Sequence, residues 1–243
     1  MINYIKAENL KLKRTFTKKL VIIMPLISLL IALLSPIWYE INAFNWWYTV
    51  ILPGYIALLC FLVHQKEKKK LKYIGVVCLP IDLKKVWMSK VLLLAKFIFI
   101  SCIILSLGIL PGGVIFPITN TIPAISIIIA GFVIAITSVW QIPLCLFIAK
   151  KAGILPTIFI NTLFGIVLNL FTVDKGIWIA CPYSFTSRLM APILGVLPNG
   201  TLGKANSPLL NTNVILPGIV LSIILFLILT FATSYWFSNQ EVK

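Results

Sequence analysis

Acidic side chains, the usual source of catalytic and metal-binding groups, are scarce in this chain and lie outside its hydrophobic stretches. The charged residue inside a stretch is Lys96, about two helical turns from the inner edge, where its side chain is expected to reach the membrane surface. Its six acidic residues are Glu8, Glu40, Glu67, Asp82, Asp174 and Glu241. A single histidine, His64, excludes any site that needs two imidazoles, and the five cysteines have no CxxC spacing. The sequence contains no G-x-x-x-x-G-K-[ST] phosphate loop. We therefore expect no catalytic residue, no metal site and no cofactor bound by this chain itself.

Uncharged polar residues do occur inside the hydrophobic stretches, and an aromatic cluster lies near the end of one of them. In lipid such polar groups more often hydrogen-bond between helices than bind a solute, and aromatic clusters are mostly interfacial anchors. The alternative interpretation is that both sets contact a substrate that crosses the membrane. The substrate-path candidates are then Trp46, Trp47, Tyr48, Thr137, Ser138, Gln141, Asn161 and Asn169.

The connection of residues 64–90 combines a basic run with a short apolar segment, residues 73–79. Asp82 follows this segment and is a suitable N-cap for a helix that begins at Leu83. An apolar segment too short to cross a bilayer needs a cover, which is either lipid or another protein. If a protein covers it, the expected contact residues are Tyr73, Ile74, Val76, Val77, Leu79, Asp82, Lys84 and Lys85.

Six stretches are long and apolar enough to cross a bilayer, which takes about 20 residues each. They begin near Leu20, Trp47, Val91, Ala124, Ile154 and Val214. Seventeen of the 21 lysines and arginines lie in residues 1–19, 64–90, 149–153 or the C-terminal tail, whereas residues 39–46, 112–123 and 172–213 hold three. By the positive-inside rule, this distribution predicts six transmembrane helices with both termini in the cytoplasm.

The composition agrees with an all-α polytopic membrane protein, because 60% of the residues are hydrophobic and only 11% are charged. The net charge of +15 lies next to the predicted spans, where anionic lipid headgroups are a nearer counterion than nucleic acid. Residues 1–19 are predicted to form a helix in the inner interface, with Ile2, Ile5, Leu12 and Phe16 near one face. Residues 20–243 form the transmembrane domain, in which residues 172–213 are expected to be short helices that dip into the outer interface.

Five segments along the chain have residue patterns that belong to one family of membrane proteins. They are residues 6–16 (KAENLKLKRTF), 45–48 (NWWY), 79–81 (LPI) with Lys84, Lys85, Trp87 and Lys90, 140–143 (WQIP) and 197–200 (LPNG). With these segments the chain resembles the ABC-2-type permeases over its whole length. Within that family it is similar to the permease subunits of lantibiotic self-immunity exporters, the nisin, epidermin and mutacin type.

The resemblance implies a permease subunit that pairs with a second permease subunit, either a related chain or a second copy. A separate cytoplasmic ATPase would bind ATP and dock on residues 64–90. The expected substrate is a lantibiotic, a cationic amphipathic peptide, which the exporter expels from the plasma membrane of a Gram-positive producer. The alternative from a different class is a non-transporting membrane sensor or assembly subunit that recruits a cytoplasmic partner.

Overall fold

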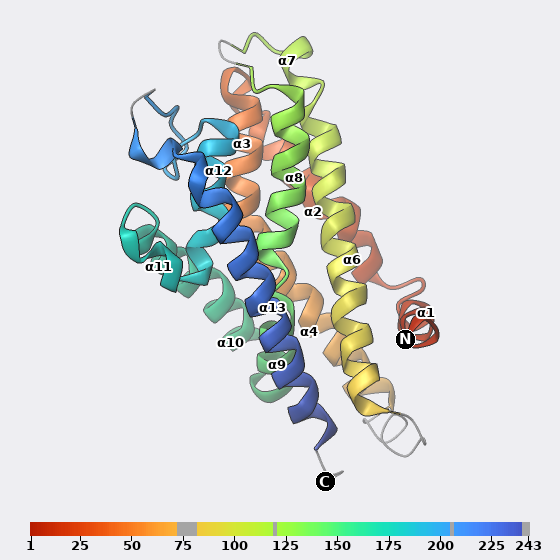
Figure 1. Ribbon diagram of the computed structural model, residues 1–243. Helices are drawn as coiled ribbons and strands as arrows, with labels where there is room; N and C mark the ends of the chain where they lie inside the picture. Colours follow the sequence, from red (N-terminus) through yellow and green to blue (C-terminus); the bar gives the residue numbers. More distant parts are fainter. Residues whose placement is uncertain (72–81, 119–120, 205–206, 240–243) are drawn as a thin grey trace.

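In the computed structural model the chain forms an elongated bundle of helices (Figure 1). The structure describes residues 1–71, 82–118, 121–204 and 207–239. Within these ranges the extended backbone contributes one isolated β-bridge, between Val196 and Leu202, and all longer elements are helical. The prediction of an all-α fold is therefore confirmed.

Among the described residues, four helical runs are long and apolar enough to cross a membrane, or six if each of two bent helix pairs is one span. The first run joins α3 (Tyr39–Trp46), a π-helix (Trp47–Ile51) and α4 (Leu52–Leu71). The second is α6 (Leu83–Ile109), and the fourth is α13 (Ile215–Ser238). The third joins α10 (Ile154–Ile158), a π-helix (Phe159–Phe164) and α11 (Gly165–Thr172). The bent pairs are α1 (Ile2–Lys11) with α2 (Phe16–Ala32), at 86°, and α8 (Ala124–Ser138) with α9 (Gln141–Ala152), at 41°.

The predicted connection of residues 39–46 is instead helix α3, which continues through the π-helix into α4. This segment can be helical and buried because its polar groups have partners in neighbouring elements. The Oε2 atom of Glu40 accepts a hydrogen bond from the backbone N–H of Ile122 at 2.7 Å, and Ser28 Oγ donates to the carbonyl of Ala43 at 2.8 Å. The second span is therefore longer than its hydrophobic stretch predicts.

The N-terminal segment also differs from its prediction as one helix over residues 1–19. Helix α1 ends at Lys11, and α2 begins at Phe16. The chain turns between them at Arg14, whose φ of 61° is incompatible with a right-handed helix. Phe16 consequently belongs to α2 and cannot share a face of α1, whereas Leu12 is buried against the bundle. The position of α1 in the membrane interface stays a prediction.

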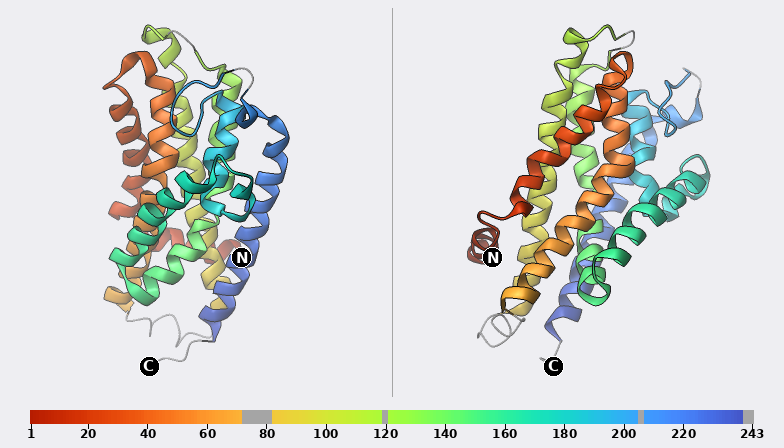
Figure 2. Two further views of the ribbon diagram at one scale, coloured as in Figure 1. Left: turned by 90° about the vertical axis from the view of Figure 1, so that its left-hand side faces the viewer. Right: turned by 180° about the vertical axis from the view of Figure 1, so that it is seen from behind.

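The two ends of the bundle differ in charge. The end of α4, the beginning of α6, the α9–α10 turn and the end of α13 all lie at one end, which we call the lysine-rich end (Figures 1 and 2). Helix α7 (Gly112–Ile115) and the turn between α2 and α3 lie at the opposite end. Chain segments predicted to be cytoplasmic are therefore neighbours in space.

The predicted outer segment, residues 172–213, contains short helices as expected. They are the 3₁₀-helices Gly176–Ala180, Pro182–Ser184, Pro208–Leu210 and Thr212–Val214, and α12 (Phe185–Leu194). Helix α12 packs against α8 and buries Phe185, Leu189 and Met190. The run from α10 to α11 leans away from the rest of the bundle (Figure 2). Its outward side chains, including Leu163 and Phe164, are exposed.

Candidate functional site

Three membrane-length elements are irregular in the same region of the bundle. The first irregularity is the π-helix Trp47–Ile51, which ends two residues before Pro53. Proline has no backbone N–H and its ring clashes with the carbonyl four residues earlier. A π-helical turn is one way to absorb that clash without ending the helix, and such turns are frequent at functional sites.

The second irregularity is the break between α8 and α9 at Val139 and Trp140. Pro143 cannot donate the hydrogen bond that would reach the Val139 carbonyl, so the helix cannot continue regularly. Just before the break, the hydroxyls of Thr137 and Ser138 donate to carbonyls one turn earlier, at 2.8 and 2.7 Å. Hydroxyl bonds of this kind bend helices, which agrees with the angle of 41° between α8 and α9.

The third irregularity, the π-helix Phe159–Phe164, brings Asn161 against the other two elements. Asn161 Nδ2 donates to the carbonyl of Pro53 and to Gln141 Oε1, each at 2.8 Å. The side chain of Thr162 faces Gly54, where an added Cβ would lie 3.6 Å from the threonine Oγ1. One asparagine thus joins the irregular parts of all three elements.

Further polar contacts continue from this point toward α12. Asn169 Nδ2 donates to Ser187 Oγ at 2.9 Å, and the hydroxyls of Thr137 and Thr186 are 3.0 Å apart. We call this set the polar seam; it comprises Thr137, Gln141, Asn161, Asn169, Thr186 and Ser187. All six side chains are buried and uncharged.

The polar seam and its surroundings retain unused hydrogen-bonding capacity. Buried atoms without a partner are Asn161 Oδ1, Thr162 Oγ1, Asn169 Oδ1, Trp140 Nε1 and Tyr48 OH. Buried polar atoms normally have a partner, because leaving one unpaired costs about 1–3 kcal/mol. Chemically these groups can donate to and accept from neutral amides and hydroxyls, and they carry no charge to move protons or attack a bond.

The structure brings together half of the sequence-predicted substrate-path residues: Thr137, Gln141, Asn161 and Asn169. Ser138 instead bonds back to its own helix. Trp46 is 45% exposed, but Trp47 is completely buried and Tyr48 nearly so. The interpretation of these rings as anchors at the membrane edge is therefore wrong for Trp47 and Tyr48. The reason is that α3, the π-helix and α4 form one continuous helical run, and the π-helix that carries both rings packs against α2 and α12.

Of the predicted docking residues, Tyr73, Ile74, Val76, Val77 and Leu79 lie outside the described residues. The predicted cap is confirmed: the Asp82 carboxylate accepts hydrogen bonds from the backbone N–H groups of Lys84 and Lys85, at 3.0 and 3.2 Å, and α6 begins at Leu83. The bond from the Lys85 backbone lowers the pKa of Asp82 below its usual 3.8. Lys84 and Lys85 are exposed, so this start of α6 is accessible.

A buried ion pair at the lysine-rich end was not predicted from the sequence. Glu67 of α4 contacts Lys90 of α6 at 2.5 Å and Lys11 of α1 at 3.5 Å, and Lys11 also contacts Glu8. Glu67 and Lys90 are 4% and 2% exposed. The one sequence signal was an acidic residue inside a run of lysines.

Neither a metal site nor a known relative accompanies this geometry. Within the described ranges, no three His, Cys, Asp or Glu side chains gather where they could hold a metal ion. Compared with models of known protein families, with curated proteins and with solved structures, the chain has no match.

Proposed function

We propose that the chain is the membrane-spanning permease subunit of an ABC exporter that expels a lantibiotic peptide from the cell membrane. A separate cytoplasmic ATPase and a second permease subunit complete the exporter in this proposal. The chain itself performs no catalysis, and its role is to bind the peptide in the membrane and release it on the outer side.

The observation that supports this proposal most is the convergence of three irregular helices on the polar seam. Non-helical backbone at membrane depth is tolerated where it lies inside protein or lines a cavity, and discontinuous helices form the binding sites of many transporters.

The chemistry of the seam favours a peptide over an ion. The free groups of the seam and its surroundings are amide and hydroxyl oxygens with the indole N–H groups of Trp47 and Trp140, and these suit the backbone amides of a peptide. The described part of the seam has no carboxylate, so proton-coupled transport has no proton carrier there. The sequence patterns NWWY and WQIP, which resemble the immunity permeases, lie next to these residues.

The test expresses the chain with its ATPase and partner permease in a lantibiotic-sensitive bacterium and measures the peptide that the cells retain. The variant Thr162→Val removes a buried hydroxyl that has no partner, so it breaks no internal hydrogen bond. If this hydroxyl contacts the peptide, retained peptide should rise about threefold or more, the equivalent of one hydrogen bond. The matched control is Thr230→Val in α13, which removes another unpartnered buried hydroxyl outside the seam.

Two outcomes separate the possibilities. Equal retention with and without the intact complex, for every lantibiotic tried, would refute export and favour the non-transporting sensor or assembly subunit. Export that both threonine variants leave unchanged would retain the exporter but show that the Thr162 hydroxyl beside the seam does not contact the peptide.

A further inference from the structure

The predicted outer segment, residues 172–213, inserts one aromatic ring into the bundle. Tyr183 is the middle residue of the 3₁₀-helix Pro182–Ser184. Its ring lies against Gly165 of α11, so closely that a Cβ added to this glycine would be 2.7 Å from the ring carbon Cδ1. The same ring meets that of Trp140 edge-to-face, with the centroids 5.0 Å apart and the planes at 76°. Tyr183 therefore lies between the α8–α9 break and the beginning of α11.

The Tyr183 ring covers the polar seam midway between its two asparagines. Asn161 is four residues before Gly165 and Asn169 is four residues after it, and all three are buried. A spacing of four residues places side chains on one face of a helix. Asn169 also donates to Ser187, which follows Tyr183 by four residues. The ring consequently closes this face of the seam on the side of the outer segment.

An aromatic ring does not satisfy the polar atoms that surround it. Asn161 Oδ1, Asn169 Oδ1 and Trp140 Nε1 are buried and have no hydrogen-bond partner. Buried polar atoms normally have one, and a tyrosine can offer only its hydroxyl. Within the described part of the chain, the Tyr183 hydroxyl makes no hydrogen bond. The ring thus occupies a place whose surroundings suit a molecule with hydrogen-bonding groups.

Only the side chain of Tyr183 has to move to uncover these groups. The backbone is anchored at the next residue, where Ser184 Oγ donates to the carbonyls of Cys181 and Trp178, at 2.7 and 3.1 Å. Rotation about χ1 of Tyr183 gives up the packing of the ring and its contact with Trp140, but it breaks no hydrogen bond. Side-chain rotations are also faster than movements of whole helices.

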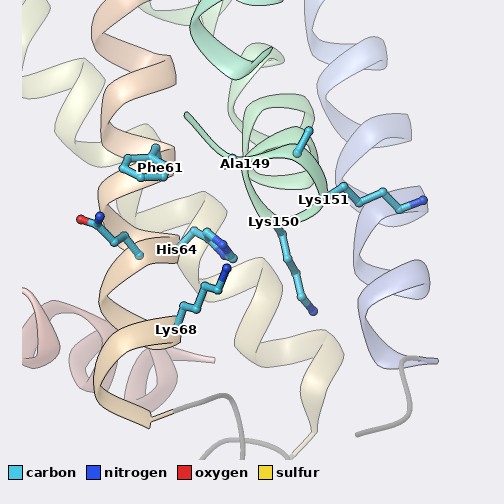
Figure 3. Close-up of a pocket in the computed structure, with 9 residues that line it drawn as sticks. Phe61, His64, Lys68, Ala149, Lys150 and Lys151 are labelled. Atoms are coloured by element: carbon cyan, nitrogen blue, oxygen red, sulfur yellow. The ribbon is translucent and has the colours of Figure 1, made fainter. Parts of the chain in front are cut away.

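The other side of the seam is already closed by packed helices. A pocket of about 670 Å³ opens at the lysine-rich end, between α4 and the end of α9 (Figure 3). It is separated from Gln141 by a contact between α4 and α9, in which Cys60 Sγ donates to the carbonyl of Ile142 at 3.6 Å. Cys60 and Cys145, one turn after Gln141, are completely buried. Displacement of Tyr183 would therefore open the seam without separating two helices.

We propose that Tyr183 is a movable plug, which closes the polar seam on the side of the outer segment and swings outward to leave a space that suits a peptide backbone. In that space peptide N–H groups can donate to the asparagine oxygens, and a peptide carbonyl can accept from Trp140 Nε1. The identity of the entering molecule rests on the proposed function, whereas the closure of the seam by Tyr183 does not.

The test follows the reaction of a cysteine in the seam with a small water-soluble methanethiosulfonate, on the purified full chain in a nonionic detergent. The reporter is Ser187→Cys, a nearly isosteric change at a buried position, combined with Cys78→Ser and Cys181→Ser. We expect Tyr183→Ala to speed the reaction about tenfold or more, because modification of a buried group follows the population of its open form. Tyr183→Phe should leave the rate unchanged, since the hydroxyl makes no hydrogen bond.

Two glycine variants test the plug with Tyr183 in place. In Gly165→Ala the new Cβ would lie 2.7 Å from the ring, which is too close, so the ring should be displaced and the reaction should also accelerate. The matched control is Gly176→Ala in the outer segment, where an added Cβ meets nothing within 4 Å and the rate should not change. Cys60 and Cys102 monitor the fold, because both are buried elsewhere in the bundle and should react only if a variant unfolds. Peptide mass spectrometry identifies which cysteine has reacted.

Three results would overturn the proposal. If Ser187→Cys reacts as fast with Tyr183 intact as a cysteine at the exposed position 204, the seam is open and has no plug. Slow reaction in both Tyr183→Ala and Gly165→Ala would make Tyr183 an ordinary packing residue. An acceleration that Cys60 and Cys102 share would be unfolding and not the movement of one side chain. Because no peptide takes part, these rates test the plug even if the chain exports nothing.

Discussion

Asn161 is the residue on which the polar seam depends most, since its amide joins Pro53 and Gln141. Replacement by leucine removes both hydrogen bonds and takes the Asn161 donor from Gln141 Oε1, so we expect the free energy of unfolding to fall by about 1–2 kcal/mol. The measurement is reversible unfolding in mixed detergent for Asn161→Leu, Gln141→Leu and the double variant.

Because the two side chains contact each other, the double variant should cost less than the sum of the single variants. Asn3→Ala, at an exposed position of α1, serves as the control and should have little effect. Strict additivity of the two seam variants would show that the hydrogen bond between Asn161 and Gln141 does not contribute to stability.

Asp82 gives the start of α6 a dependence on pH. Its pKa is lower in the folded chain, because the charged carboxylate accepts hydrogen bonds from the backbone of Lys84 and Lys85. The cap is therefore complete above the usual pKa of 3.8 and is lost as the pH falls through the lower folded value. We expect the amides of Lys84 and Lys85 to exchange hydrogen more slowly in the wild type than in Asp82→Ala at pH 6, and this difference should shrink as the pH falls below 3.8.

The variant Asp82→Asn provides the control for this titration. Asparagine also caps helices but has no proton to gain, so its protection relative to Asp82→Ala should not change with pH. If the protection of the wild type relative to Asp82→Ala is also the same at every pH, the carboxylate charge does not contribute to the cap.

The break between α8 and α9 is the element that positions Gln141 in the seam. Pro143→Ala restores a backbone N–H that can reach the Val139 carbonyl, so the two helices should approach a straight line. Spin labels at the exposed positions 125 and 151 should then move apart by up to about 2 Å, given the helical rise of 1.5 Å per residue. We expect peptide retention in the export assay to rise, because Gln141 moves away from Asn161.

Pro217→Ala is the control variant for this prediction. Pro217 lies in the first turn of α13, where its missing N–H has no helical partner to lose. This variant should alter neither the distance nor the retention. An unchanged distance in Pro143→Ala would assign the bend to the hydroxyl bonds of Thr137 and Ser138.

How well each feature could be predicted depends on how far apart in the sequence its interacting residues are. The cap at Asp82 and the helix from Leu83 depend on neighbours in sequence, and both were predicted correctly. The polar seam was predicted in part, because an asparagine in an apolar stretch is visible without a structure. The burial of Trp47 was not predictable, since it results from the packing of its π-helix against α2 and α12, and α12 is distant in the sequence. The pair Glu67–Lys90 was missed because its members come from different helices.

At the scale of the whole molecule, the asymmetric charge predicts which end of the bundle faces the cytoplasm. Single cysteines in place of Lys151 and Lys204 should report this, with Cys78 replaced by serine. The other four cysteines are buried and should not react. In intact cells a membrane-impermeant maleimide should label the variant at 204 and not the one at 151. Both should react in permeabilised cells, and labelling at 151 in intact cells would reverse the proposed orientation.

The contacts of Glu67 also determine the order in which the chain can be assembled. Helix α1 leaves the ribosome first, but its partner carboxylate lies 56 residues after Lys11, and the second lysine on that carboxylate arrives only with α6. Until α6 is synthesised, Glu67 has Lys11 but not Lys90, and burial of a carboxylate that lacks its closer partner is costly. Helix α1 is translated first and is thus among the last segments to reach its final position in the bundle. Chains truncated before residue 83 should accordingly show protease-sensitive N-termini, whereas longer nascent chains that include α6 should protect them.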